Sequence, residues 1–133
     1  MKRQKGQSLV EFALVVPLFL LLLFGIIYSG MFFHDYSSLS NTARSAAREA
    51  AIIEGDNYTD IKTYYSNECG KTLTSLYKLK DNGFSITKGD DDAVYVRISM
   101  ERTLFSAVMN MVLPESFDIV YFMKKDTPAS TGN

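Results

Sequence analysis

The sequence predicts an α+β protein in which a long N-terminal helix, membrane-spanning in its first half, packs on a small antiparallel sheet of about three strands. Three observations predict this class. Nearly every residue from Leu9 to Phe33 is apolar, and apolar residues then recur every three or four positions as far as Ile53. In the second half of the chain, apolar and polar residues alternate over short segments, which is typical of strands with one buried face.

The composition excludes several kinds of site. Three unopposed positive charges lie in the first six residues, and without them the formal net charge falls from −1 to −4. Such a chain lacks the basic patch that nucleic acid requires, so we expect no nucleic-acid partner. The single cysteine, Cys69, excludes an intramolecular disulfide and a multi-cysteine zinc site. The sequence contains no phosphate-binding glycine loop and no metal-ligand cluster. We therefore expect that the protein has no catalytic residue, metal or cofactor and that it is not an enzyme.

The apolar run is long enough to cross a membrane, because about 20 apolar residues span a bilayer as a helix. It is too long for a cleaved secretory signal, and no small-x-small site follows it. A basic tip (Lys2, Arg3 and Lys5) precedes the run, whereas polar and acidic residues follow Phe33. This asymmetry predicts a single span with the N-terminus in the cytoplasm and the rest outside. Membrane lipid is therefore one expected partner.

Glu11 is the only charged residue in the apolar run. A carboxylate is costly there and usually has a partner or a function. One interpretation is that Glu11 lies about one turn inside the interface and reaches water. The other is that a protease cuts after Gly6, so that Gln7 gains an α-amine with a pKa of about 8. That amine would lie four residues from Glu11, on the same helix face. Both interpretations remain open on these grounds.

Pro17 interrupts the same run. A proline inside a helix removes one hydrogen bond and clashes with the preceding turn, so we expect a helix kink near residues 13–17. Membrane helices tolerate such an interruption.

The stretch Gly6-Gln7-Ser8-Leu9-Val10-Glu11-Phe12-Ala13-Leu14-Val15-Val16-Pro17 resembles TadE-like pseudopilins of the tight-adherence (Flp, type IVb) pilus system. The resemblance is specific over this stretch and only architectural beyond it. It implies a pilin-like fold. It also implies that a prepilin peptidase cuts between Gly6 and Gln7, and that Glu11 and Phe12 help recruit or register the subunit by neutralising an N-terminal amine.

The resemblance further implies a function, a location and partners. TadE-like proteins are processed minor components that act in assembling a pilus used for adhesion. The expected partners are a prepilin peptidase and, through the N-terminal helix, other pilin and pseudopilin subunits. The expected location is the bacterial inner membrane, or the pilus itself. The alternative function is that of a single-pass membrane-anchored protein whose extracytoplasmic domain binds a ligand or an envelope partner. In that case Gly6 is incidental and Glu11 reaches the interface.

We divide the chain into five parts. Residues 1–6 are a cytoplasmic leader, 7–33 the transmembrane helix, 34–55 its soluble extension, 56–125 an extracytoplasmic α+β head and 126–133 a flexible tail. An alanine-rich apolar stripe predicts the extension: Phe32, Tyr36, Leu39, Ala43, Ala46, Ala50 and Ile53. Gly55 ends it. The stripe could pack on the head of its own chain or on another subunit. His34 beside Asp35 is expected to be a polar anchor at the outer interface, because adjacent residues on a helix do not face each other.

A second helix is predicted over about Tyr58–Leu76, with apolar residues on one face. Gly70 weakens it and could break it. Cys69 lies on the apolar face, where the simplest interpretation is a buried thiol; an intermolecular disulfide is the alternative.

The remaining elements are short. Asp81-Asn82-Gly83 indicates a turn, followed by a strand over 84–87 and a second turn over 89–92. The three aspartates of that second turn suggest calcium, but adjacent carboxylates do not surround an ion, so a solvated turn is favoured. Strands are predicted over 93–102 and 117–124, and a short helix over 104–112 ends before Pro114.

Overall fold

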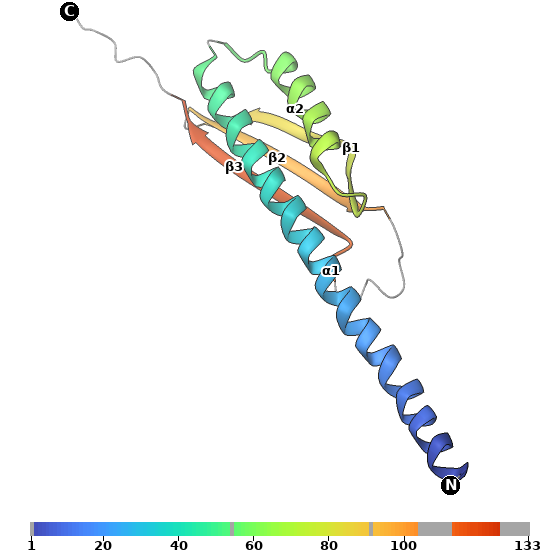
Figure 1. The fold of residues 1–133 in the computed structure, drawn as a ribbon. Coiled ribbons are helices and arrows are strands. Elements are labelled where there is room, and N and C mark those ends of the chain that lie inside the picture. The colour runs from blue at the N-terminus through green and yellow to red at the C-terminus, as the bar shows by residue number, and fades with distance from the viewer. Residues whose placement is uncertain (1, 54, 91, 104–112, 126–133) are drawn as a thin grey trace, which may run out of the picture.

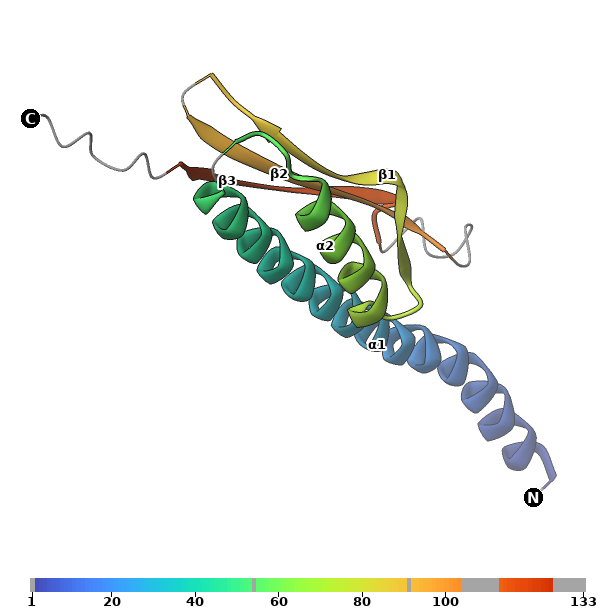
Figure 2. The same ribbon diagram turned by 90° about the horizontal axis from the view of Figure 1, so that it is seen from above.

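The computed structural model describes residues 2–53, 55–90, 92–103 and 113–125. It contains five elements: α1 (Lys2–Ile52), α2 (Thr59–Thr72), β1 (Tyr77–Lys88), β2 (Ala93–Arg102) and β3 (Ser116–Lys124). The strands form one antiparallel sheet in the order β1-β2-β3. Both helices cover the same face of this sheet, and the first half of α1 extends beyond it (Figures 1 and 2). The predicted α+β arrangement is confirmed.

Helix α1 is longer than the sequence pattern indicated. It begins at Lys2, five residues before the predicted transmembrane helix, and ends at Ile52, one residue before Ile53, the last residue of the predicted stripe. Gly55 follows with a φ of +106°, a backbone conformation that glycine adopts readily and that cannot continue a helix. The helix continues through Pro17, which lacks the N–H that would otherwise bond to the carbonyl four residues earlier.

The second half of α1 packs on the head of its own chain. Four alanines of the predicted stripe region have no exposed surface: Ala43, Ala46, Ala47 and Ala50. They belong to one hydrophobic core with the fully buried side chains of β2, which are Val94, Val96, Ile98 and Met100. Small side chains allow the helix axis to lie close to the sheet. The stripe therefore joins α1 to the head through a shared hydrophobic core. Of the two partners considered for the stripe, the structure shows the head of the same chain.

Helix α2 is shorter than predicted. It continues through Gly70 but ends at Thr72, and Leu73 is already extended with φ −75° and ψ 143°. Leu76 keeps the helical spacing in the sequence, yet it lies beyond the helix and is buried in the core. The prediction for Cys69 is confirmed, because its side chain is a buried free thiol.

The turn predicted at Asp81-Asn82-Gly83 is wrong, since these residues lie inside β1. Leu79 pairs with Met100 and Phe84 pairs with Ile98, so four residues of β1 bulge opposite one residue of β2. Asn82 takes a positive φ of 56°, and a Cβ added at Gly83 would lie 2.5 Å from the Ser99 carbonyl oxygen. The residue types that favour a turn also favour a β-bulge, which needs the same backbone conformations.

The other two strands agree with their predictions. β2 has the predicted bounds, and β3 begins one residue earlier, at Ser116. Along both strands the predicted faces alternate between the core and solvent. The turn between β1 and β2 closes with a 2.7 Å hydrogen bond from the Gly89 N–H to the Ala93 carbonyl. The predicted helix at 104–112 and the predicted tail at 126–133 lie outside the described residues.

Candidate functional site

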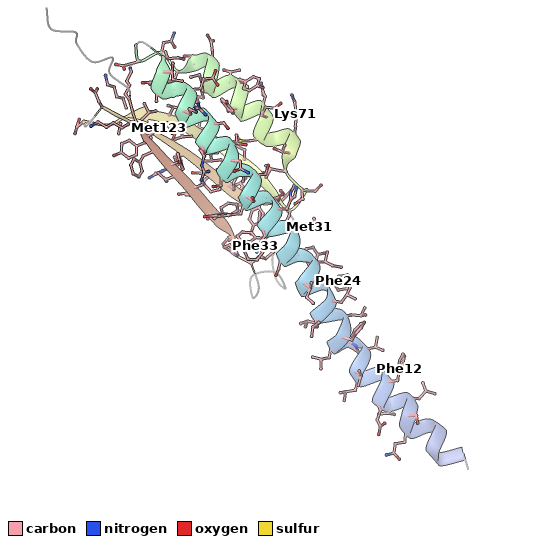
Figure 3. All side chains as sticks on the ribbon, turned by 60° about the vertical axis from the view of Figure 1, so that its left-hand side comes forward. Phe12, Phe24, Met31, Phe33, Lys71 and Met123 are labelled. Atoms are coloured by element: carbon pink, nitrogen blue, oxygen red, sulfur yellow. The ribbon has the colours of Figure 1, made fainter. Side chains whose placement is uncertain are left out.

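The first half of α1 stands free of the head. From Leu9 to Ile27 its large apolar side chains are mostly exposed, and Figure 3 shows Phe12 and Phe24 pointing away from the helix with no other element beside them. Gly6–Ile27 measures about 33 Å at 1.5 Å per residue, close to the roughly 30 Å hydrocarbon core of a bilayer. Of the two helices in the described residues, α1 is the one that is long and apolar enough to cross a membrane.

The predicted site residues lie at the free end of this segment. Gly6 is exposed, and a Cβ added there would meet no atom within 4 Å. The Gly6–Gln7 bond is near the start of α1, so its cleavage would leave Gln7–Ile52 able to remain helical. Glu11 is exposed one turn after Gln7, and the helix places these two residues on one face, as their spacing predicts. Phe12 follows with 69% of its surface exposed.

An aromatic cluster marks where the bare segment ends and the head begins. Phe32 of α1 packs against Tyr77 and Phe117, with ring centroids 5.8 and 5.4 Å away, and those two rings are 5.0 Å apart. The Tyr77 hydroxyl donates to the Pro114 carbonyl at 2.8 Å. Burial raises the pKa of Tyr77, so this hydroxyl remains a donor. Met31 and Phe33, labelled in Figure 3, lie at the same level of the helix.

Asp35 was wrongly expected to be an interfacial polar anchor. It has no exposed surface, and its two carboxylate oxygens accept hydrogen bonds from the Thr74 N–H at 2.9 Å and the Thr74 hydroxyl at 2.6 Å. His34 does contact it, with Nδ1 3.4 Å from an Asp35 oxygen, although the histidine side chain stays 63% exposed. The available signal was the position of Asp35, three residues after Phe32 and four before Leu39, on the buried face.

These features define a class of protein in which a candidate membrane anchor helix continues into the core of a small α+β head. The family model described as TadE-like protein matches residues 6–48. The match begins at Gly6 and ends inside α1, so it covers the anchor and most of its extension but neither α2 nor the sheet. Over residues 6–48 this chain is similar to TadE-like proteins, and the resemblance seen at Gly6–Pro17 is confirmed. Searches of curated proteins and of solved structures gave no match.

Proposed function

We propose that this chain is a TadE-like minor pilin, or pseudopilin, that a prepilin peptidase processes and that acts in assembling a Tad (Flp, type IVb) pilus for adhesion. The observation that carries the proposal is the TadE-like match, which begins at Gly6 and follows α1 through the candidate span. The same match, together with the bare apolar helix, supports a membrane-anchored protein associated with a Tad pilus system.

Cleavage after Gly6 would change the charge at the end of the helix. It would remove Lys2, Arg3 and Lys5, the basic residues that favour a cytoplasmic N-terminus. It would also create an amine at Gln7, with a pKa of about 8, one turn before Glu11. Among residues with described side chains, none pairs with Glu11. A cation from the same or a neighbouring subunit would lower the cost of keeping this carboxylate at the lipid boundary.

The division of α1 suits a structural subunit rather than an enzyme. Its second half is held in the core of the head, so the bare half can exchange lipid contacts for contacts with other helices without unfolding the head. Helix association in lipid depends on side-chain packing and polar pairs, because lipid tails are as apolar as leucine. An amine–carboxylate pair would set the register of such contacts.

The direct test of this role replaces Glu11 in cells that lack the native copy. We expect Glu11→Ala and Glu11→Gln to insert into the membrane normally but to enter the assembly about tenfold less, as the loss of about 1.4 kcal/mol would give. Val15→Ala is the matched control, since Val15 is 56% exposed one turn further along the same helix. Equal incorporation of all variants would exclude the pairing. Normal pilus assembly in cells without the chain would favour the anchored binding protein.

A further inference from the structure

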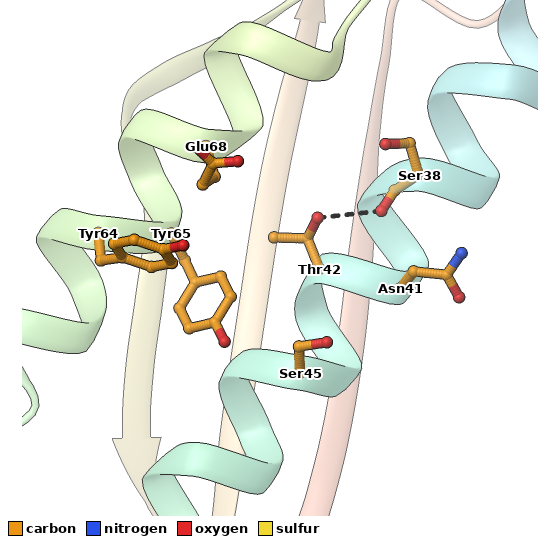
Figure 4. A pocket seen from close by; sticks show the side chains of 7 residues that line it. All are labelled: Ser38, Asn41, Thr42, Ser45, Tyr64, Tyr65 and Glu68. Carbon is orange, nitrogen blue, oxygen red and sulfur yellow. Dashed lines mark hydrogen bonds between the residues drawn. The ribbon is translucent and has the colours of Figure 1, made fainter.

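A polar groove runs between α1 and α2 and has a volume of about 300 Å³. Its seven lining residues all carry polar groups: Ser38, Asn41, Thr42, Ser45, Tyr64, Tyr65 and Glu68. Figure 4 shows the α1 residues on one wall and the two tyrosines and Glu68 on the other. None of these seven side chains is buried, so the groove is open to solvent and its polar groups are accessible to a ligand from outside.

Some of these polar groups already have partners within the protein. The Thr42 hydroxyl donates to the Ser38 carbonyl at 3.0 Å, and Lys71 donates to Glu68 at 3.0 Å. The Tyr65 hydroxyl donates to Glu49 at 2.9 Å, and burial together with that carboxylate raises the pKa of Tyr65 to about 12. The Tyr65 side chain is therefore held in place on one side of the groove, and its hydroxyl stays neutral.

Other groups in the groove have unused hydrogen-bonding capacity. In the described part of the chain, no hydrogen bond to protein is formed by the side chains of Ser38, Asn41 and Ser45 or by the Tyr64 hydroxyl. The Tyr64 ring stands perpendicular to Tyr65, with centroids 5.1 Å apart, and remains 61% exposed. The groove thus offers hydroxyl and amide groups beside a large, solvent-facing aromatic surface.

This chemistry selects a ligand class. Serine and tyrosine hydroxyls and an asparagine amide can both donate and accept, which matches a ligand with many hydroxyl groups. An aromatic ring with a polar end suits a ligand that has both C–H faces and hydroxyls. The carboxylates of Glu49 and Glu68 disfavour an anionic ligand, and the groove is at the small end of ligand sites, which occupy roughly 300–1,000 Å³. We propose that the α1–α2 groove binds one ring of a neutral polysaccharide.

The test uses the full chain in phosphatidylcholine nanodiscs, because sugar-headed detergents would compete for the groove. Soluble tetrasaccharides of β-linked N-acetylglucosamine, β-glucose, α-glucose and mannose are titrated while ligand-observed NMR records binding. We expect at least one to bind with a dissociation constant on the order of millimolar. Tyr64→Ala should weaken binding about tenfold, whereas Tyr64→Trp, which keeps a stacking surface, should retain it.

The control variant is Tyr95→Ala. Tyr95 is an equally large aromatic side chain, 41% exposed on the face of the sheet that the helices leave uncovered, and its removal should leave binding unchanged. Absence of a signal with all four sugars would overturn the proposal, as would equal binding by the Tyr64→Ala variant or an equal loss with Tyr95→Ala. Binding of a lysine-rich peptide in place of every sugar would make the groove a cation site instead. None of these outcomes depends on cleavage after Gly6, so this proposal and the proposed function can fail separately.

Discussion

Asp35 on α1 and Thr74 in the connection after α2 are joined by two hydrogen bonds, one from the threonine N–H and one from its hydroxyl. The two residues are 39 positions apart, and the carboxylate that accepts both bonds is completely buried. The pair lies one turn beyond Phe32, where α1 leaves the head. It therefore fixes the anchor helix to the head at the end of the bare segment.

Removing this carboxylate should loosen that junction. In Asp35→Ala, the Thr74 N–H and hydroxyl lose their acceptor, which we expect to cost about 2–3 kcal/mol of unfolding free energy. Thermal unfolding in nanodiscs, followed by circular dichroism, measures the change. Thr74→Ser keeps both donors and is the matched control, whereas Thr74→Val removes one donor from a buried charge. If Asp35→Ala unfolds at the same temperature as the unaltered protein, the pair does not hold the junction.

The bulge in β1 should tolerate no side chain at Gly83. A Cβ there would lie 2.5 Å from the Ser99 carbonyl oxygen and 2.8 Å from that of Lys80, both of them backbone atoms. We expect Gly83→Ala to lower the free energy of unfolding by about 1–3 kcal/mol, the usual range for overpacking. Denaturant unfolding of the full chain provides the measurement.

Gly70 is the control for that substitution. It lies inside α2 with open space around it, so Gly70→Ala should stabilise the protein by about 0.5–1 kcal/mol through helix propensity. Destabilisation by both substitutions, or by neither, would contradict the bulge geometry.

Cys69 should be unreactive while the protein is folded. Burial raises the pKa of its thiol from 9.0 to about 11, so at pH 8.5 iodoacetamide should label the native protein about 100-fold more slowly than the denatured chain. The raised pKa contributes stability below pH 9 that is lost as the pH rises towards 11, because only the unfolded thiol ionises in that range. Cys69→Ala should remove this part of the pH dependence of stability. The separate contribution of Tyr65, whose pKa is raised from 10.0 to about 12, should remain. Rapid native labelling would instead favour the intermolecular disulfide.

Much of the fold could be predicted because local patterns and tertiary packing agree. In β2 the alternation of Val94, Val96 and Ile98 with polar residues gave the strand its exact bounds, since one face is buried and the other is not. The alanine stripe predicted how α1 meets the sheet for the same reason. The TadE-like stretch was recognisable because its residue order is specific from Gly6 to Pro17.

The features that sequence missed depend on distant partners. The spacing places Asp35 on the buried face of α1, but the two donors that satisfy its carboxylate come from Thr74, 39 residues along the chain, and no local pattern around Asp35 identifies that partner. The bulge was mistaken for a turn because Asn82 and Gly83 serve either structure, and only the pairing with β2 decides between them. The groove between the helices lies on polar positions that a helical pattern treats as solvent-facing.

We predict that α1 of the mature protein begins at Gln7, with the Gln7 amine one helical turn from Glu11. Mass spectrometry of the intact protein, purified from cells that contain the prepilin peptidase, tests it most directly. We predict a mature chain without residues 1–6, and an uncleaved chain for Gly6→Leu, which leaves the helix sterically undisturbed. A functional protein that still begins at Met1 would contradict the claim.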